Sequence, residues 1–122
     1  MTSMAEMLDK VLVDLKKVGG VEASVVASRD GLLIASNIQS YGARAETFAA
    51  MSATMLGAAE TATTELGKGV PDRVIVETEH GKLIATGAGS KALLIVLTDP
   101  DAGLGLILVE LEKAAEKVKN IL

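Results

Sequence analysis

The stretch that decides the fold is Lys91-Ala92-Leu93-Leu94-Ile95-Val96-Leu97-Thr98-Asp99, in which every residue from 92 to 97 is apolar. A strand with one face in solvent alternates apolar and polar residues, because successive side chains point to opposite faces of the sheet. A continuous apolar run of strand length is typical of a strand that is covered on both faces. A buried helical segment is the alternative, but the run is short and Pro100 follows it. We therefore expect a central strand with helices on both sides.

The composition indicates a small domain with few chemically special groups. The 122 residues include no cysteine, 1 histidine, 1 tyrosine and 1 phenylalanine, and the net charge is −4. Without cysteine there is neither a disulfide nor a thiolate metal site, and without a clustered basic face nucleic-acid binding is disfavoured. The apolar runs are far shorter than the roughly 20 residues of a membrane span. We expect one domain over residues 1–122, cytoplasmic, not inserted in a membrane, and without metal or cofactor.

The spacing of apolar residues predicts three helices. The first covers residues 4–18 and is capped by Ser3, and the second covers residues 41–67. The third follows Asp99, which we predict as its N-cap, with Pro100 at the first helical position.

Two hairpins complete the pattern. Residues 21–38 turn at Asp30-Gly31, and residues 72–88 turn at His80-Gly81. Glycine favours such turns because it adopts positive φ at low cost. The strand over 72–79 carries several charges, which is typical of a sheet edge. The chain order is helix, two strands, helix, three strands, helix, so we expect a mostly antiparallel sheet.

The second predicted helix lacks the charged outer face of a solvated helix. One of its faces carries the larger groups and the neighbouring positions are small; the larger ones are Phe48, Met51, Met55, Ala59, Ala62 and Leu66. Exposed apolar area of this kind usually marks an interface. We expect a second helix to pack here, from another copy of the chain, with ordinary burial in a monomer as the alternative.

The sequence contains no combination of residues that indicates a catalytic site. His80 lies in a predicted turn and has no serine assigned to it as nucleophile. Residues 87–92 (GAGSKA) do not satisfy the phosphate-loop pattern, because a strand follows them where a helix is required. Glu77 and Glu79 share a strand face, but exposed acidic pairs at an edge are usually solvated. The residues favour a binding module over an enzyme, with no catalytic residue.

Three segments carry a resemblance to a known family. They are residues 21–36 (VEASVVASRDGLLIAS), residues 81–97 (GKLIATGAGSKALLIVL) and residues 104–118 (LGLILVELEKAAEKV). In this order they resemble the roadblock (dynein light chain) family, and its prokaryotic MglB-like members in particular. The resemblance implies a three-layer α/β (α+β) sandwich of roadblock, profilin-like architecture. Its five-stranded antiparallel sheet has the order 2-1-5-4-3, with residues 92–97 central and residues 72–79 at an edge.

The resemblance also implies a homodimer that joins through the edge strand and the long second helix. The interface residues would be Ala49, Ala53, Leu56, Gly57, Glu60, Thr64, Val74, Ile75, Val76 and Glu77. The resemblance further implies a non-enzymatic platform that binds a small Ras-like GTPase and regulates its nucleotide cycle, or that scaffolds other assemblies. The GTPase contact would then involve Arg44, Thr47 and Met51.

Two other functions are compatible with the residues. A small-molecule sensor domain of related helix–sheet architecture is the first alternative, although pockets for such ligands usually recruit more aromatic residues. An enzyme ranks last, because no base–nucleophile pair is found. Arg44 could act as an arginine finger on a GTPase, but a surface arginine near a helix start is usually solvated.

Overall fold

The structure is a computed structural model that describes residues 2–38 and 44–122. The described residues form three helices and five strands in the expected order. These elements are α1 (Met4–Lys16), β1 (Val21–Ser28), β2 (Leu33–Asn37), α2 (Ala45–Glu65), β3 (Arg73–Thr78), β4 (Gly81–Ala88), β5 (Ala92–Thr98) and α3 (Leu104–Ile121). The strands form one antiparallel sheet in the order β2-β1-β5-β4-β3, which confirms the predicted topology.

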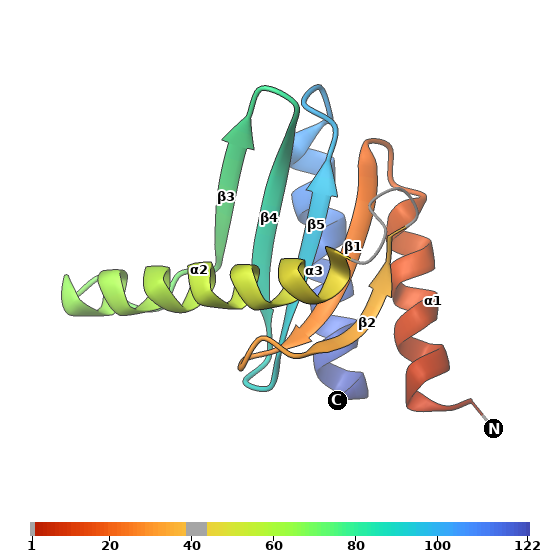
Figure 1. Ribbon diagram of the computed structural model, residues 1–122, viewed down its shortest axis with the longest axis horizontal. Helices are drawn as coiled ribbons and strands as arrows, with labels where there is room; N and C mark the ends of the chain where they lie inside the picture. Colours follow the sequence, from red (N-terminus) through yellow and green to blue (C-terminus); the bar gives the residue numbers. More distant parts are fainter. Residues whose placement is uncertain (1, 39–43) are drawn as a thin grey trace.

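Helices cover both faces of the sheet, so the architecture has three layers (Figure 1). Leu94 and Val96 of β5 point into the core cluster under α1 and α3, whereas Leu93 and Ile95 point into the cluster under α2. All four side chains are at most 1% exposed. The continuous apolar run of β5 therefore reflects burial on both faces, as its pattern predicts.

The first helix begins as its capping residues predict. Ser3 Oγ accepts a hydrogen bond from the backbone N–H of Glu6 at 3.1 Å and also donates to the Glu6 carboxylate at 3.2 Å. The helix ends at Lys16, slightly before the predicted end. Gly20, with a φ of +94°, then turns the chain into β1.

The predicted start of the last helix is wrong. The helix α3 begins at Leu104 with Gly103 as its N-cap, and no side chain caps it. The backbone N–H of Asp99 instead donates to the carbonyl of Gly20 at 2.8 Å, which ties this segment to the entrance of β1. Ala102 packs against Gly20, where an added Cβ would lie 2.5 Å from the Ala102 methyl group. The Asp-Pro signal therefore marks a turn held by a tertiary contact, not a first helical turn.

The second helix ends two residues before its predicted end. It spans Ala45–Glu65, and the predicted start at residues 41–43 lies outside the described residues. Gly67, with a φ of +71°, follows the C-cap Leu66 and ends the helix. The left-handed conformation at this position is the one that glycine adopts without a steric penalty.

Candidate functional site

Two outer elements stand out as a surface for partners, the helix α2 and the edge strand β3. Figure 1 shows α2 crossing the strands and projecting beyond β3 with its C-terminal half. The α2 residues that pack on the sheet all lie between positions 48 and 56: Phe48, Ala49, Ala53, Met55 and Leu56. The following part of the helix has no sheet beneath it. Its side chains there are mostly alanine and threonine, and most are exposed.

Two residues predicted for the dimer interface belong instead to the core of this chain. Ala49 and Leu56 are 0% and 2% exposed and pack against the sheet. Together with Ser52 they form the buried face of α2, at spacings of three and four residues. Small side chains let the helix approach the strands closely. The prediction assigned Ala49 and Leu56 to the partner-facing side of this helix. That side was hard to distinguish from the sheet-facing side because the helix carries so few charged residues.

The other predicted interface residues on α2 are differently placed. Ala53 is half-buried and packs on the core, whereas Thr64 is exposed. Gly57 is surrounded by open space, since no atom lies within 4 Å of the place where a Cβ would stand. Glu60 is paired within the chain. Of the α2 residues in that prediction, Gly57 and Thr64 are the ones that the fold leaves free to meet a partner.

The β3 strand forms an open edge of the sheet. Among the described residues it pairs only with β4, through six consecutive residue pairs from Arg73–Thr86 to Thr78–Gly81. Val74 points to the α2 side and Ile75 to the α1 and α3 side. Val76 is half-buried and Glu77 is exposed. The four predicted strand residues are thus brought together along one unpaired edge.

An arginine that the sequence reasoning overlooked holds α2 in place. Arg29, at the end of β1, extends Nη1 to the two Glu60 carboxylate oxygens at 3.2 and 3.3 Å and donates from Nη2 to the Gly89 carbonyl at 2.7 Å. A Cβ at Gly87 would lie 2.6 Å from Arg29 Nη2, so this glycine makes room for the guanidinium group. Two glycines at the end of β4, Gly87 and Gly89, and an arginine at the β1–β2 turn are the signal that could have indicated this contact.

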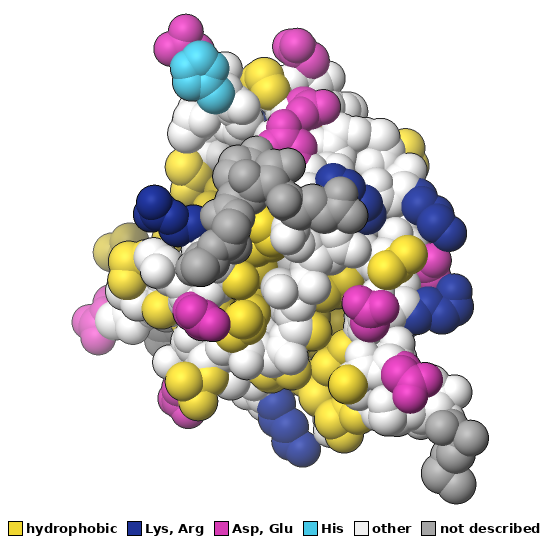
Figure 2. Space-filling model, turned by 45° about the vertical axis from the view of Figure 1, so that its right-hand side comes forward, with side chains coloured by type: hydrophobic (Ala, Val, Ile, Leu, Met, Phe, Trp, Pro, Cys, Tyr) yellow, Lys and Arg dark blue, Asp and Glu magenta, His cyan; other side chains and the backbone are white. Residues whose placement is uncertain are grey.

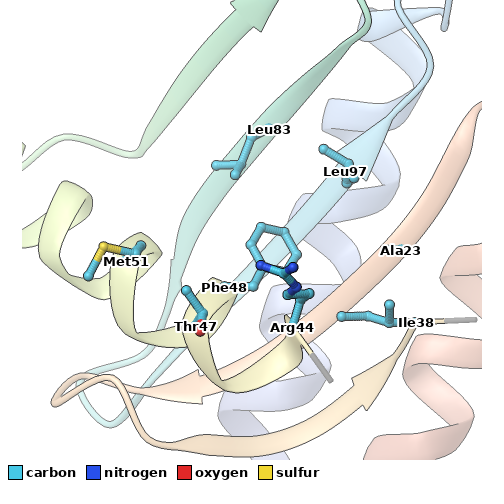
Figure 3. Close-up of a pocket in the computed structure, with 8 residues that line it drawn as sticks. All are labelled: Ala23, Ile38, Arg44, Thr47, Phe48, Met51, Leu83 and Leu97. Atoms are coloured by element: carbon cyan, nitrogen blue, oxygen red, sulfur yellow. The ribbon is translucent and has the colours of Figure 1, made fainter. Parts of the chain in front are cut away.

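An apolar groove of about 390 Å³ lies between the first half of α2 and the sheet (Figure 3). Its walls are Ala23 of β1, Leu83 of β4, Leu97 of β5, Ile38 and Phe48. The three residues predicted for GTPase contact, Arg44, Thr47 and Met51, all line the same groove. Met51 is 60% exposed. The structure therefore brings these three together at one opening.

A pair of carboxyl groups lies near the same end of the sheet, at the start of β1 and just after β5. A side-chain hydrogen bond with Glu22 raises the pKa of Asp99, and partial loss of hydration adds to the shift. Lys16 acts in the opposite direction, and its Nζ donates to the Glu22 backbone carbonyl at 2.6 Å. This network couples α1 to the sheet end and lies outside the groove lining.

The remaining surface shows few features that suggest chemistry. Figure 2 shows exposed hydrophobic side chains between scattered charges of both signs. Within residues 2–38 and 44–122, no group of three or more histidine, cysteine, aspartate or glutamate residues is placed to hold a metal ion. No helix in this part of the chain is long and apolar enough to cross a bilayer.

The sequence pattern of the Roadblock/LC7 domain matches residues 7–98. The chain belongs to this family. The roadblock domain is 42% identical over 113 residues to the uncharacterized protein MJ1340 of Methanocaldococcus jannaschii, an alignment that covers 93% of this chain and 97% of that protein.

Two solved structures confirm the architecture of the roadblock domain. A structure described as MglB with tetrameric arrangement superposes with a TM-score of 0.89 at 22% identity, covering 99% of this chain and 91% of that one. Profilin II of Acanthamoeba castellanii superposes with a TM-score of 0.66 at 20% identity, covering 97% and 98%. At these identities the likeness shows the fold, which is of the roadblock and profilin-like type.

Proposed function

We propose that this roadblock domain is a non-enzymatic homodimeric regulator or scaffold that binds a small Ras-like GTPase and modulates its nucleotide cycle. The observation that carries the proposal is the overhang of α2 beyond the open β3 edge. A helix with no sheet beneath it and a strand with no neighbour are both completed by a second copy of the same two elements. The family resemblance supplies the GTPase as the partner class.

The geometry favours a two-fold dimer with a continuous sheet. A second β3 strand can pair with the free edge in antiparallel orientation, and each α2 then extends over the partner's sheet. Exposed apolar residues near the overhang support this arrangement, since Leu66 is 76% and Val70 is 73% exposed. The two-fold axis stands perpendicular to the sheet, so both α2 helices lie on one face of the dimer.

That shared face is the proposed GTPase platform. The two apolar grooves open on it, each lined by Arg44, Thr47 and Met51. An apolar side chain of the GTPase enters the groove, and an acidic one pairs with Arg44. Binding of this kind favours one arrangement of the GTPase switch loops and thereby shifts their population. The roadblock domain needs no catalytic group for this mechanism.

A pair of glycine substitutions tests the dimer. Gly57 lies on α2 and Gly105 on α3, and at both positions a Cβ would have no atom within 4 Å of it. Glutamate at either site is tolerated in the protomer and improves helix propensity. We expect Gly57→Glu to convert the dimer to a folded monomer in analytical ultracentrifugation, and Gly105→Glu to leave it dimeric. A wild-type chain that sediments as a monomer at all concentrations would remove the basis of the proposal.

Calorimetric titration tests GTPase binding. Ras-like GTPases from the same organism are titrated with the dimer in their GDP-bound and GTP-analogue-bound states. We expect a difference in affinity between the two states, which Arg44→Ala reduces without altering sedimentation. The roadblock domain alone is expected to hydrolyse no GTP. Absence of binding by every such GTPase in both states would contradict the platform function.

The groove also supports a second candidate, a small-molecule sensor. Its volume of about 390 Å³ lies within the roughly 300–1,000 Å³ of ligand pockets. A thermal shift with a defined metabolite that disappears in Phe48→Ala would favour this function. A dimer that shows no such shift but binds a GTPase would exclude it.

A further inference from the structure

We infer that the two β3 strands of the homodimer meet in one register, with Ile75 of each copy at the two-fold axis and Arg73 of each copy opposite Glu77 of the other. The inference rests on the proposed function in one respect, that β3 is the dimer edge. It adds the alignment of the two strands and the residues that select the partner. The occupant of the edge is thereby a second copy of this chain.

The faces of the strand restrict the register. Ile75 packs into the cluster under α1 and α3, so Arg73 and Glu77 point to the same side. Val74 packs into the cluster under α2, and Val76 shares its face of the sheet by alternation. A two-fold axis perpendicular to the sheet preserves these faces. Residues opposite each other in an antiparallel pair share a face. The axis must therefore pass beside a residue, because an axis between two residues would oppose side chains from different faces.

The backbone pattern of the hairpin favours an axis at Ile75. Thr78 and Gly81 flank the two-residue turn between β3 and β4 and form its closing pair. Backbone hydrogen bonds alternate along an antiparallel ladder from that pair. The N–H and C=O groups that face the open edge consequently belong to Arg73, Ile75 and Glu77. With the axis at Ile75, all three of these residues pair with the partner strand.

The charges of the strand favour the same axis. With Ile75 at the axis, Arg73 of each copy stands opposite Glu77 of the other, so the two-fold symmetry gives two such pairs. Val74 of each copy stands opposite Val76 of the other. An axis at Val76 would place the charged Glu77 opposite the apolar Ile75 of the second copy. An axis at Val74 would place the charged Arg73 opposite Ile75 of the second copy. An axis at Glu77 would bring two carboxylates together, which is destabilising. The Ile75 register is the one that pairs opposite charges and β-branched side chains within the strand.

Both charges of this pair are unsatisfied within the protomer. Among the residues that the structure describes, Arg73 forms no ion pair within 4.0 Å, although it lines a polar groove with Glu112 and Glu116. Glu77 stands opposite Lys82 on β4, but Lys82 Nζ donates instead to the Pro100 carbonyl at 2.7 Å. A second copy supplies the missing partner to each. A related chain with a different charge at either position would place like charges together, so the edge selects its own kind.

Cysteine scanning tests the register directly, because the chain contains no cysteine. Residues that face each other in a hydrogen-bonded pair have Cα atoms about 5.5 Å apart, which is within disulfide range. We expect Ile75→Cys to form a crosslinked dimer on mild oxidation, seen on a non-reducing gel. Val74→Cys and Val76→Cys should each remain uncrosslinked alone and should crosslink when mixed. Crosslinking of either variant alone, with Ile75→Cys unreacted, would overturn the register.

A charge swap tests partner selection. We expect Arg73→Glu and Glu77→Arg each to weaken the dimer at least tenfold in concentration-dependent sedimentation, and the double variant to recover most of the loss. Circular dichroism confirms that each protomer is folded. A wild-type chain without dimers overturns the proposed function itself. A wild-type dimer whose double variant stays as weak as the singles overturns the charge pairing alone.

Discussion

The two edges of the sheet, β2 and β3, differ in how they are protected. Helices α1 and α2 both contact β2, and the pairing of β2 with β1 shifts register between Val26 and Ala27. The β3 strand pairs regularly with β4 along its whole length, and α2 crosses the sheet at the start of β3 and projects beyond it. An irregular register discourages further strand pairing, whereas a regular open strand favours it. We therefore expect a further strand to pair at β3 rather than at β2.

A lysine at each edge tests this difference and has the largest expected effect. Val76 is half-buried on β3, and Ile34 is 40% exposed on β2. We expect Val76→Lys to weaken the dimer at least a hundredfold, about 2.7 kcal/mol, because it places a charged side chain opposite the apolar Val74 of the second copy at the interface. Ile34→Lys is the matched control and should leave sedimentation unchanged. Equal weakening by both substitutions would show that the two edges do not differ.

The Arg29 contact fixes the position of α2, whose C-terminal half projects beyond the β3 edge. We expect Arg29→Ala to lower the free energy of unfolding by about 1–2 kcal/mol in chemical denaturation, since it removes charge-assisted hydrogen bonds to Glu60 and Gly89. Lys10→Ala removes an exposed ion pair with Asp14 and serves as the control. Its expected loss is below about 0.5 kcal/mol. If both variants lose the same stability, Arg29 is an ordinary surface residue.

The carboxyl pair at the sheet end has the smallest expected effect and belongs to neither edge. The pKa of Asp99 is raised in the folded protein by its hydrogen bond with Glu22. Asp99 consequently binds its proton more tightly in the folded state than in the unfolded state. The stability that this protonation contributes is present at low pH and is lost as pH rises through the folded-state pKa of Asp99. We expect Asp99→Asn to raise the melting temperature at pH 7 and to have little effect at low pH.

Asp14→Asn should show the opposite sign. A hydrogen bond from Lys10 lowers the pKa of Asp14, so its contribution is present at neutral pH and lost as pH falls. We expect this variant to lower the melting temperature at pH 7, and neither variant to change dimerisation. A rise in melting temperature for both variants would contradict the assigned causes.

The elements of this protein with strong local patterns could be predicted closely. The apolar run of β5, the Ser3 cap and the two hairpins depend on neighbours in the chain, and all are found in the structure. The strand order came from the family resemblance and is also confirmed. The structure places the predicted site residues in two kinds of surroundings. Arg44, Thr47 and Met51 line one groove, but Ala49 and Leu56 are buried in the protomer's own core.

Local sequence patterns specify which segments become helices and strands, because backbone hydrogen bonding and side-chain periodicity act over a few residues. Tertiary structure decided three further points. It turned residues 99–103 away from α3 through the contact with Gly20, it selected the face of α2 that meets the sheet, and it joined Arg29 to Glu60. Each depends on residues distant in the chain, and α2 has too few charges for its periodicity to mark the buried side.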